Sequence, residues 1–378
     1  MEGKILFLAF KELKHAKLRY AMMTAIIVLI AWLVFILSGL GNGLSTLSAA
    51  TLKNINAEYV VYEETAGATF AKSILSEDIM EDLKKQKDIE DVAAFGASTI
   101  SVGKTTSKDA DDKEDVALIG LEPDAFVMPT VIEGEKLSLS NKKGVVINDT
   151  LKKAGYKIGD KLHVSNSNLK VEVIGFVKDE TFNHLPAMFA VPETWRSYQY
   201  AAPGSDNGLN KPVQAFFLKA PNLEPEKLDT SIDDIETVTK SKAVNGMPGY
   251  TAENGTIMMM LAFCIVISAF IIAVFFYVIT MQKTQQFGVM KAIGASNGFI
   301  ARAIVAQVAI LSVVGILIGI LLTYATALAF PEGMPFNLDP VLVTTYAIIL
   351  LIIALLSSIV SVRQIVKIDP LTALGRVE

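Results

Sequence analysis

The chain has 378 residues, of which 52% are hydrophobic and 19% charged, and its formal net charge at pH 7 is −5. This composition is too apolar for a soluble domain of that length, and the acidic balance argues against nucleic acid as a partner. A single cysteine, Cys264, excludes an intrachain disulfide and a cysteine-based metal site.

Four apolar runs predict membrane-spanning helices, at residues 21–40, 256–280, 303–329 and 340–361. None of the four contains Asp, Glu, Lys or Arg. Each is long enough to cross a hydrocarbon core of about 30 Å, which takes roughly 20 helical residues. The first run is too long for the apolar part of a secretory signal, so we expect it to be retained as an anchor.

The distribution of charge predicts the topology. Residues 1–20, the loop at 281–302 and the tail after 361 carry an excess of Lys and Arg, which places the loop and both termini in the cytoplasm. Residues 41–255 carry 23 basic and 33 acidic side chains and must lie outside. We therefore expect an α-helical membrane protein, with four transmembrane helices and a large extracytoplasmic α/β domain inserted between helices 1 and 2.

The expected parts follow one another along the chain. An amphipathic cytoplasmic helix at 1–20 either anchors the chain on anionic lipid or helps to seat a cytoplasmic partner. After it come transmembrane helix 1 and a stalk at 21–56, the extracytoplasmic domain at 57–255, transmembrane helix 2 at 256–280, a cytoplasmic loop at 281–302, transmembrane helices 3 and 4 at 303–329 and 340–361, and a cytoplasmic tail at 362–378.

Within the extracytoplasmic domain, alternation and turn residues predict a mixed α/β structure. The segments 159–164 and 170–177 alternate with period two around a Ser-Asn-Ser-Asn turn, which is typical of a β-hairpin. The other expected strands are 60–62, 92–102, 116–121, 144–148 and 215–219, the expected helices are 76–87, 149–154 and 224–240, and 104–115 is expected to be a flexible loop.

No catalytic constellation is present in the sequence. His163 and His184 have no metal-ligand spacing between them, so we expect no structural metal. There is no Walker A motif, no Gly-x-Ser-x-Gly and no His-Glu-x-x-His. The chain is therefore not expected to be an enzyme, and it cannot hydrolyse ATP by the P-loop route.

The loop at 281–302 contains a segment that is built for contact. Phe287, Met290 and Ile293 recur every three residues, so a short helix here would carry an apolar ridge. Gly288 and Gly294 permit close approach or a sharp turn. Because the ridge has no evident partner within the chain, we expect it to dock on another protein.

The third run contains the sequence Gly-Ile-Leu-Ile-Gly, with glycines at Gly315 and Gly319. Two small residues at this spacing predict a face for close helix packing. The alternative is that these glycines are incidental, since glycine is common in membrane helices.

The order of these parts, together with two motifs, resembles the permease subunits of macrolide-exporter-type ABC transporters, the FtsX-like permeases. Residues 286–296 are similar to the coupling-helix signature of that family, which more often has Glu at the position of Gln286. Residues 363–374 are similar to its closing motif, in which a basic helix end meets a Pro-x-x-Ala-Leu turn.

The resemblance implies a homodimer of permease chains in the bacterial inner (cell) membrane, bound to two separate ATP-binding cassette ATPase subunits. The ATPases would push on the loop at 285–296, and the spans would transmit this movement outward by mechanotransmission. It also implies an external domain with a small α/β lobe and a β-rich lobe. The coupling residues that it assigns are Gln286, Phe287, Gly288, Met290, Lys291, Ile293 and Gly294.

Residues 10–20 and 38–44 resemble, more specifically, the permeases of bacterial heme exporters. Heme is flat and apolar, bears two propionates and partitions into membranes, so a dimer pore at the outer leaflet could collect it as a substrate. Met and Tyr are recognised ligands of haem iron, and carboxylate oxygen suits ferric iron. The candidate heme residues are Tyr59, Tyr62, Glu63, Glu64, Met247, Met258, Met259 and Met260.

Alternatives remain open for these residues and for the cargo. Methionines also serve as adaptable packing, and Glu63 and Glu64 also suit a solvated stalk. The same architecture could export antimicrobial peptides, macrolides or lipoproteins, or could regulate a cell-wall enzyme without transporting anything. We expect no covalently bound cofactor, and ATP only through the partner subunit.

Overall fold

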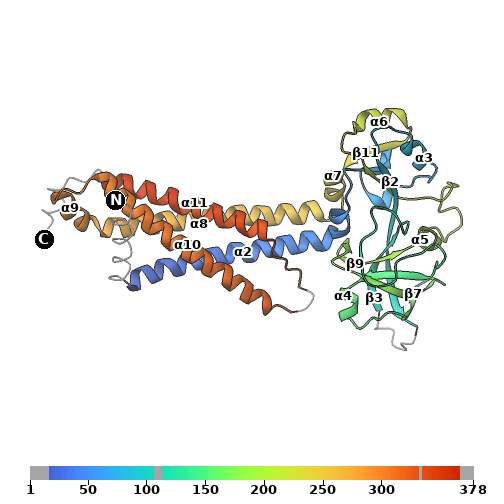
Figure 1. Ribbon diagram of the computed structural model, residues 1–378, viewed down its shortest axis with the longest axis horizontal. Helices are drawn as coiled ribbons and strands as arrows, with labels where there is room; N and C mark the ends of the chain where they lie inside the picture. Colours follow the sequence, from blue (N-terminus) through green and yellow to red (C-terminus); the bar gives the residue numbers. More distant parts are fainter. Residues whose placement is uncertain (1–16, 106–112, 332–333, 367–378) are drawn as a thin grey trace. The chain divides into compact units, whose positions relative to one another are not determined.

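A computed structural model describes residues 17–105, 113–331 and 334–366 of the chain. The chain divides into two compact units (Figure 1). The first comprises Met1–Gly43 and Gly255–Glu378 and contains the long helices, and the second, Leu44–Asn254, is the inserted α/β domain. The second unit starts before the expected residue 57 because Ala49, Leu52 and Ile55, at the end of the first helix, pack in its core.

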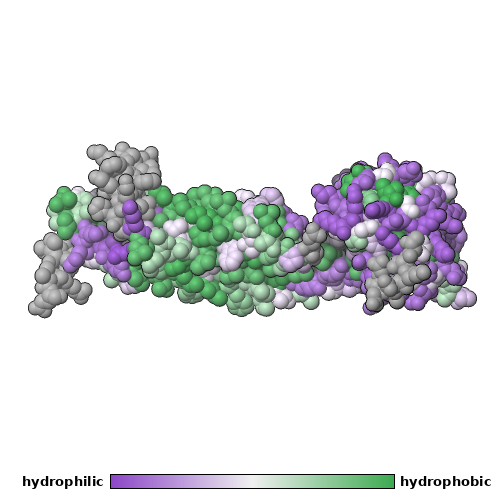
Figure 2. Space-filling model, turned by 90° about the horizontal axis from the view of Figure 1, so that it is seen from below, coloured by the Kyte–Doolittle hydropathy of each residue, from purple (hydrophilic) through white to green (hydrophobic). Residues whose placement is uncertain are grey.

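Four helices in the described part of the chain are long and apolar enough to cross a membrane, which confirms the four predicted spans. On the face seen in Figure 2, apolar side chains cover most of the middle of the helical unit. The helices are α2 (Lys17–Asn54), α8 (Tyr250–Gln282), α10 (Asn297–Leu328) and α11 (Pro340–Val366). A short fifth helix, α9 (Thr284–Ala292), lies between α8 and α10.

The helix α2 continues past the first apolar run, as the predicted stalk requires. It bends at Ala49, whose backbone is not helical (φ −150°, ψ 27°). In the first unit, Ala31, Val34 and Phe35 of α2 are fully buried among apolar residues of α8, α10 and α11. Because lipid tails are as apolar as these side chains, their burial stabilises the unit through close packing between helices and not through removal from water.

The inserted domain is built on one large sheet, in which β3–β9 and β5–β7 are the parallel pairs and the other described pairs are antiparallel. Its strand order is β11-β1-β10-β2-β3-β9-β5-β7-β4, with β6 beside β2 and β7, and β8 beside β9. The strands are β1 (Tyr59–Glu63), β2 (Asp91–Lys104), β3 (Lys113–Gly120), β4 (Val131–Gly134), β5 (Gly144–Asn148), β6 (Lys161–Val164), β7 (Lys170–Val177), β8 (Thr181–Phe182), β9 (Leu185–Ala190), β10 (Ala215–Lys219) and β11 (Ile235–Thr239).

Short helices fill the connections of this domain. They are η1 (Glu64–Ala66), η2 (Phe70–Lys72), α3 (Ile79–Lys84), α4 (Thr150–Lys153), α5 (Pro192–Gln199), α6 (Pro225–Ser231) and α7 (Lys240–Asn245). The predicted hairpin is confirmed, because β6 and β7 pair antiparallel with Leu162 opposite Val171.

The helix expected at 224–240 is wrong over its second half. Helix α6 ends at Ser231, and Asp234 then adopts a left-handed backbone (φ 61°) that no helix can continue through. The following residues form strand β11, which pairs along the whole length of β1. Cross-strand pairing therefore overrode the local helical preference. The strands β4, β8 and β9 and the helices α5 and α7 were not predicted either.

Three sequence predictions lie wholly or partly outside the described residues. They are the amphipathic helix at 1–20, of which only residues from 17 onward are described, the centre of the loop expected at 104–115, and the closing motif at 363–374. Around that loop, β2 extends to Lys104 and β3 begins at Lys113, so both strands are longer than expected.

Candidate functional site

The helix α9 is held against the spanning helices of its own chain. The backbone N–H of Phe287 donates to the carbonyl oxygen of Lys283 at 3.0 Å, which starts the helix directly after α8. Its C-terminal end is closed by Gly294, whose positive φ of 97° suits glycine. The next helix, α10, begins at once, since the hydroxyl of Ser296 accepts the N–H of Phe299.

The predicted apolar ridge is wrong in detail. Phe287 is only 5% exposed, and together with the half-buried Met290 it packs into the core of the helical unit. The large apolar side chains in the open here are Val289 of α9, 49% exposed, and Ile293 directly after it, 81% exposed. Spacing by three could not reveal this, because it does not show which helical face the rest of the bundle covers.

The remaining predicted coupling residues also divide into buried and open positions. Gly288 is buried, Lys291 is half-buried, and Gln286 and Gly294 are exposed. The open surface of this segment, which we call the α9 surface, is formed by Gln285, Gln286, Val289, Ala292, Ile293 and Gly294. It combines polar and apolar side chains and has no acidic residue.

The two glycines of α10 lie against α2. A Cβ atom placed on Gly315 would meet Cγ2 of Ile27 at 2.7 Å, and one on Gly319 would meet Cβ of Ala31 at 2.7 Å. The indole Nε1 of Trp32 donates to Oγ1 of Thr326 at 3.0 Å farther along the same contact. Because Gly315 and Gly319 have no side chain, α10 can approach α2 closely at these two positions.

We expect Gly319→Leu to destabilise the helical unit by about 1–3 kcal/mol, because the added side chain must push α10 away from α2. A lower midpoint of thermal unfolding of the purified chain in detergent would report this. Gly298→Leu is the matched control, since no atom lies within 4 Å of a Cβ placed there. Equal losses for both variants would contradict a packing role for Gly319.

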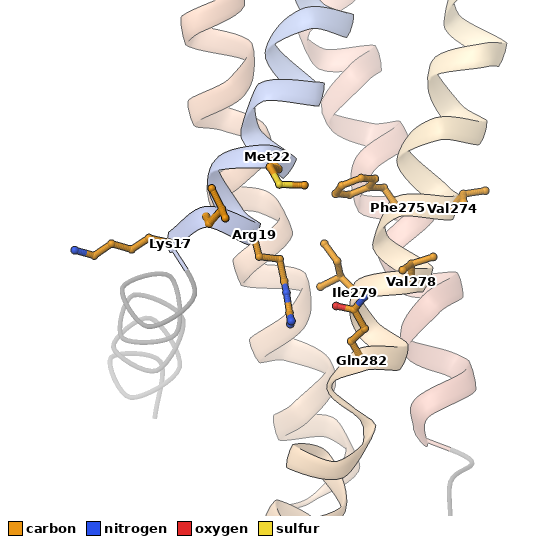
Figure 3. Close-up of a pocket in the computed structure, with 9 residues that line it drawn as sticks. Lys17, Arg19, Met22, Val274, Phe275, Val278, Ile279 and Gln282 are labelled. Carbon is orange, nitrogen blue, oxygen red and sulfur yellow. The ribbon is translucent and has the colours of Figure 1, made fainter.

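A groove of about 780 Å³ lies between the first turns of α2 and the last turns of α8 (Figure 3). Arg19 extends toward Ile279 and Gln282 on α8, whereas Lys17 points away. The walls are otherwise apolar, and the charged lining residues are basic. The two helices that line this groove were predicted from the sequence, but their position side by side was not.

Two of the candidate heme residues lie in the closed core of the inserted domain. The side chains of Tyr62 and Met247 are 0% and 4% exposed. Burial, and secondarily the charge of Glu236, raise the pKa of the Tyr62 phenol, which disfavours the phenolate that would bind ferric iron. Tyr62 and Met247 are therefore removed from the candidate ligands.

The other candidates on β1 and after it are more accessible. Tyr59 is half-buried and its hydroxyl donates to the carbonyl oxygen of Leu223 at 3.3 Å. The carboxylate of Glu63 accepts the hydroxyl of Thr65 at 2.9 and 3.0 Å, and Glu64 is exposed. Glu64 thus has the more open carboxylate of the two.

The three consecutive methionines of α8 lie in the first unit. Met258, Met259 and Met260 are 57%, 56% and 47% exposed. Successive residues of a helix differ by about 100° in direction, so the three thioethers sweep a wide arc of the surface. None of them is needed to fill the core of its own chain.

One cluster of polar contacts in the inserted domain was not predicted from the sequence. His184, which has a left-handed backbone (φ 65°), places its Nε2 atom 3.3 Å from Oε1 of Glu253 and 3.2 Å from Oγ of Ser48. This group ties the end of α2, the β8–β9 turn and the first turn of α8 together. Among the described residues, no group of three or more His, Cys, Asp or Glu could hold a metal ion.

Two family models match the chain. Residues 20–235 match the MacB-like periplasmic core domain, and residues 258–370 match the FtsX-like permease C-terminal model. The candidate membrane helices and the α/β domain inserted between the first and second of them are the parts that these two models describe. The chain belongs to the FtsX-like permeases with a MacB-like periplasmic core domain.

Individual relatives align over nearly the full length. The putative hemin transport system permease protein HrtB of Staphylococcus haemolyticus is 24% identical, over 98% of this chain and 99% of its own. The protein of the same description from Staphylococcus epidermidis is 25% identical over 97% and 99%. An uncharacterized ABC transporter permease of Mycobacterium tuberculosis is 25% identical over 98% and 99%.

Solved structures are similar to about half of the chain. The extracellular domain of the noncanonic ABC-type transporter YknZ from Gram-positive bacteria has a TM-score of 0.35 and 13% identity, and covers 48% of this chain and 100% of that one. The periplasmic region of MacB from Actinobacillus actinomycetemcomitans has a TM-score of 0.36 and 14% identity, with coverages of 51% and 94%.

Proposed function

We propose that this chain is the permease subunit of an ABC-type efflux system that exports heme from the membrane. The observation that carries the proposal is the alignment with hemin transport permeases over 97–98% of this chain and 99% of theirs. In the proposed assembly, two permease chains form a homodimer in the bacterial cell membrane with their termini in the cytoplasm. Two ATPase subunits bind from that side.

Exposed soft ligands support heme as the cargo. Met258, Met259 and Met260 offer thioether sulfur on a helix with no charged residue between Gly255 and Gln282. Thioether sulfur binds haem iron, and an apolar helical surface suits the porphyrin face. Glu63 and Glu64 of the inserted domain are a separate pair of candidate ligands. The methionines point outward from a single chain, so a second copy of the chain would complete the binding surface.

The α9 surface supports an ATPase as the partner. The segment at 281–302, which carries this surface, connects two candidate spans. It contains Lys283, Lys291 and Arg302 and no acidic residue, which favours a cytoplasmic position. Val289 and Ile293 are exposed although they are apolar, as expected of residues that a partner covers. The chain has no Walker A motif of its own, so the energy of ATP must come from another subunit.

Hemin titration of the purified permease tests the cargo. We expect a saturable shift of the Soret band, and we expect Met258→Ala, Met259→Ala, Met260→Ala or Glu64→Ala to weaken binding. Loss of an iron ligand that costs about 1.4 kcal/mol would raise the dissociation constant about tenfold. The binding curve of each variant gives this constant directly.

Met281→Ala is the matched control, because Met281 is 42% exposed on the same helix and near its other end. Its hemin affinity should equal that of the unmodified chain. If hemin gives no saturable shift and does not change the ATPase rate of the reconstituted complex, heme is not the cargo. In that case a deletion strain should be tested for sensitivity to peptide antibiotics and macrolides.

A further inference from the structure

Three polar side chains meet in the interior of the helical unit, next to α9. Tyr20 of α2, Lys283 between α8 and α9, and Gln307 of α10 are only 4%, 7% and 7% exposed. We call them the Lys283 cluster. Lys283 belongs to the basic loop at 281–302, yet in the structure its side chain turns inward among apolar side chains.

The contacts of the Lys283 cluster join three helices. The ammonium Nζ of Lys283 donates to Oε1 of Gln307 at 3.3 Å and lies 5.3 Å from the centre of the Tyr20 ring. A buried ammonium is unfavourable unless it is compensated, and an amide oxygen together with an aromatic face provides compensation. An apolar side chain would fill the same space without the cost of a buried charge, so packing alone does not explain why this residue is a lysine.

The backbone of Lys283 is part of the joint between α8 and α9. Its N–H donates to the carbonyl oxygen of Thr280 at 3.2 Å, and its own carbonyl oxygen accepts the N–H of Phe287 at 3.0 Å. A tilt of α9 would therefore displace Lys283, whose ammonium contacts Gln307 of α10 and lies over the Tyr20 ring of α2.

The Lys283 cluster also contains polar atoms that can take over a contact. Within the part of the chain that the structure describes, the hydroxyl of Tyr20 and Nε2 of Gln307 have no hydrogen-bond partner. A cavity of about 20 Å³ is lined by these residues, Lys283 and Phe287. An ammonium has three donors, so a displacement of the Lys283 side chain toward α2 would let it bond to the Tyr20 hydroxyl in place of Gln307.

We propose that Lys283 is a positioning residue, which passes a displacement of α9 to α2 and α10 by exchanging its contact between Gln307 and Tyr20. The inference rests on the proposed function in one respect, namely that an ATPase subunit acts on α9. A packed helical core changes between discrete states and does not deform continuously. The two hydrogen-bond arrangements of Lys283 would correspond to two such states.

The test measures an ATP-driven movement without using heme. Spin labels are attached at Leu29→Cys on α2 and Leu321→Cys on α10, in a Cys264→Ala background, since both leucines are exposed. Pulsed EPR distances are recorded for the permease–ATPase complex without nucleotide and with trapped ATP and vanadate. We expect a nucleotide-dependent change of distance in the parent chain and its loss in Lys283→Met, with assembly and hydrolysis retained.

Tyr20→Phe separates this role from a purely structural one. It keeps the ring and removes only a hydroxyl that has no partner among the described residues, so a structural role predicts no effect. Contact exchange predicts that the distance change is lost. Lys283→Arg should restore part of the change, and Lys17→Met, which removes an exposed charge at the start of α2, should leave it intact.

The outcomes distinguish the two proposals. A distance change that persists in either Lys283→Met or Tyr20→Phe overturns contact exchange and leaves the proposed function standing. Failure of the parent chain to assemble with the ATPase overturns both. Absence of hemin binding overturns heme as cargo but does not affect this measurement.

Discussion

The double variant Val289→Glu/Ile293→Glu is expected to prevent assembly with the ATPase while the permease itself stays folded. Both side chains are open to solvent at α9, so two new charges do not disturb the helical core. Burying them under a partner would be strongly unfavourable, and each such position is worth about 2 kcal/mol or more at the centre of an interface. Copurification with the ATPase and the ATPase rate of the mixture measure the effect.

Two further variants make this prediction specific. Gln282→Glu adds a negative charge at an exposed position of α8, outside the α9 surface, and we expect the complex to form normally. Phe287→Ala removes a ring from the core and should lower the stability of the permease alone by about 3–5 kcal/mol. If the double variant still assembles and hydrolyses ATP at the parental rate, the ATPase docks elsewhere.

Trp195→Ala is expected to destabilise the inserted domain by about 3–5 kcal/mol, because it opens a cavity in a closed core. Trp195 is 1% exposed, and its indole Nε1 donates to Oγ of Ser98 at 2.8 Å. The Tyr200 ring packs edge-on against it, with ring centres 5.6 Å apart. Differential scanning calorimetry of the full chain should show the transition of this domain shifted by about 10 °C.

The glycines beneath Trp195 provide the control for this prediction. A Cβ atom on Gly96 would lie 2.3 Å from the indole ring, and one on Gly120 would lie 2.7 Å from Cβ of Trp195. Gly96→Ala alone should therefore destabilise the domain. Part of that loss should disappear when Gly96→Ala is combined with Trp195→Phe, since the two positions share one space. Strict additivity of the two losses would contradict the predicted clash.

Most of the helical unit was predictable because its signals are local. A span of about 20 residues without charge has few alternatives to a membrane helix, and all four expected spans are present. The β6–β7 hairpin was predictable for the same reason, since alternation and a polar turn lie next to each other in the sequence. The strand β11 was not, because its partner β1 lies far away in the sequence.

The same distinction between local signals and long-range packing applies to the candidate site. The sequence by itself determined the four spans, the excess of basic residues around α9, the absence of a phosphate loop and the presence of three adjacent methionines, because each is a property of a short segment. Only the tertiary structure decided that Phe287 faces inward while Ile293 faces out, that Tyr62 is buried, and that Lys283 meets Tyr20 and Gln307. Which side of a residue is covered depends on helices and strands that are distant in the chain, and their packing is not a local property of any segment.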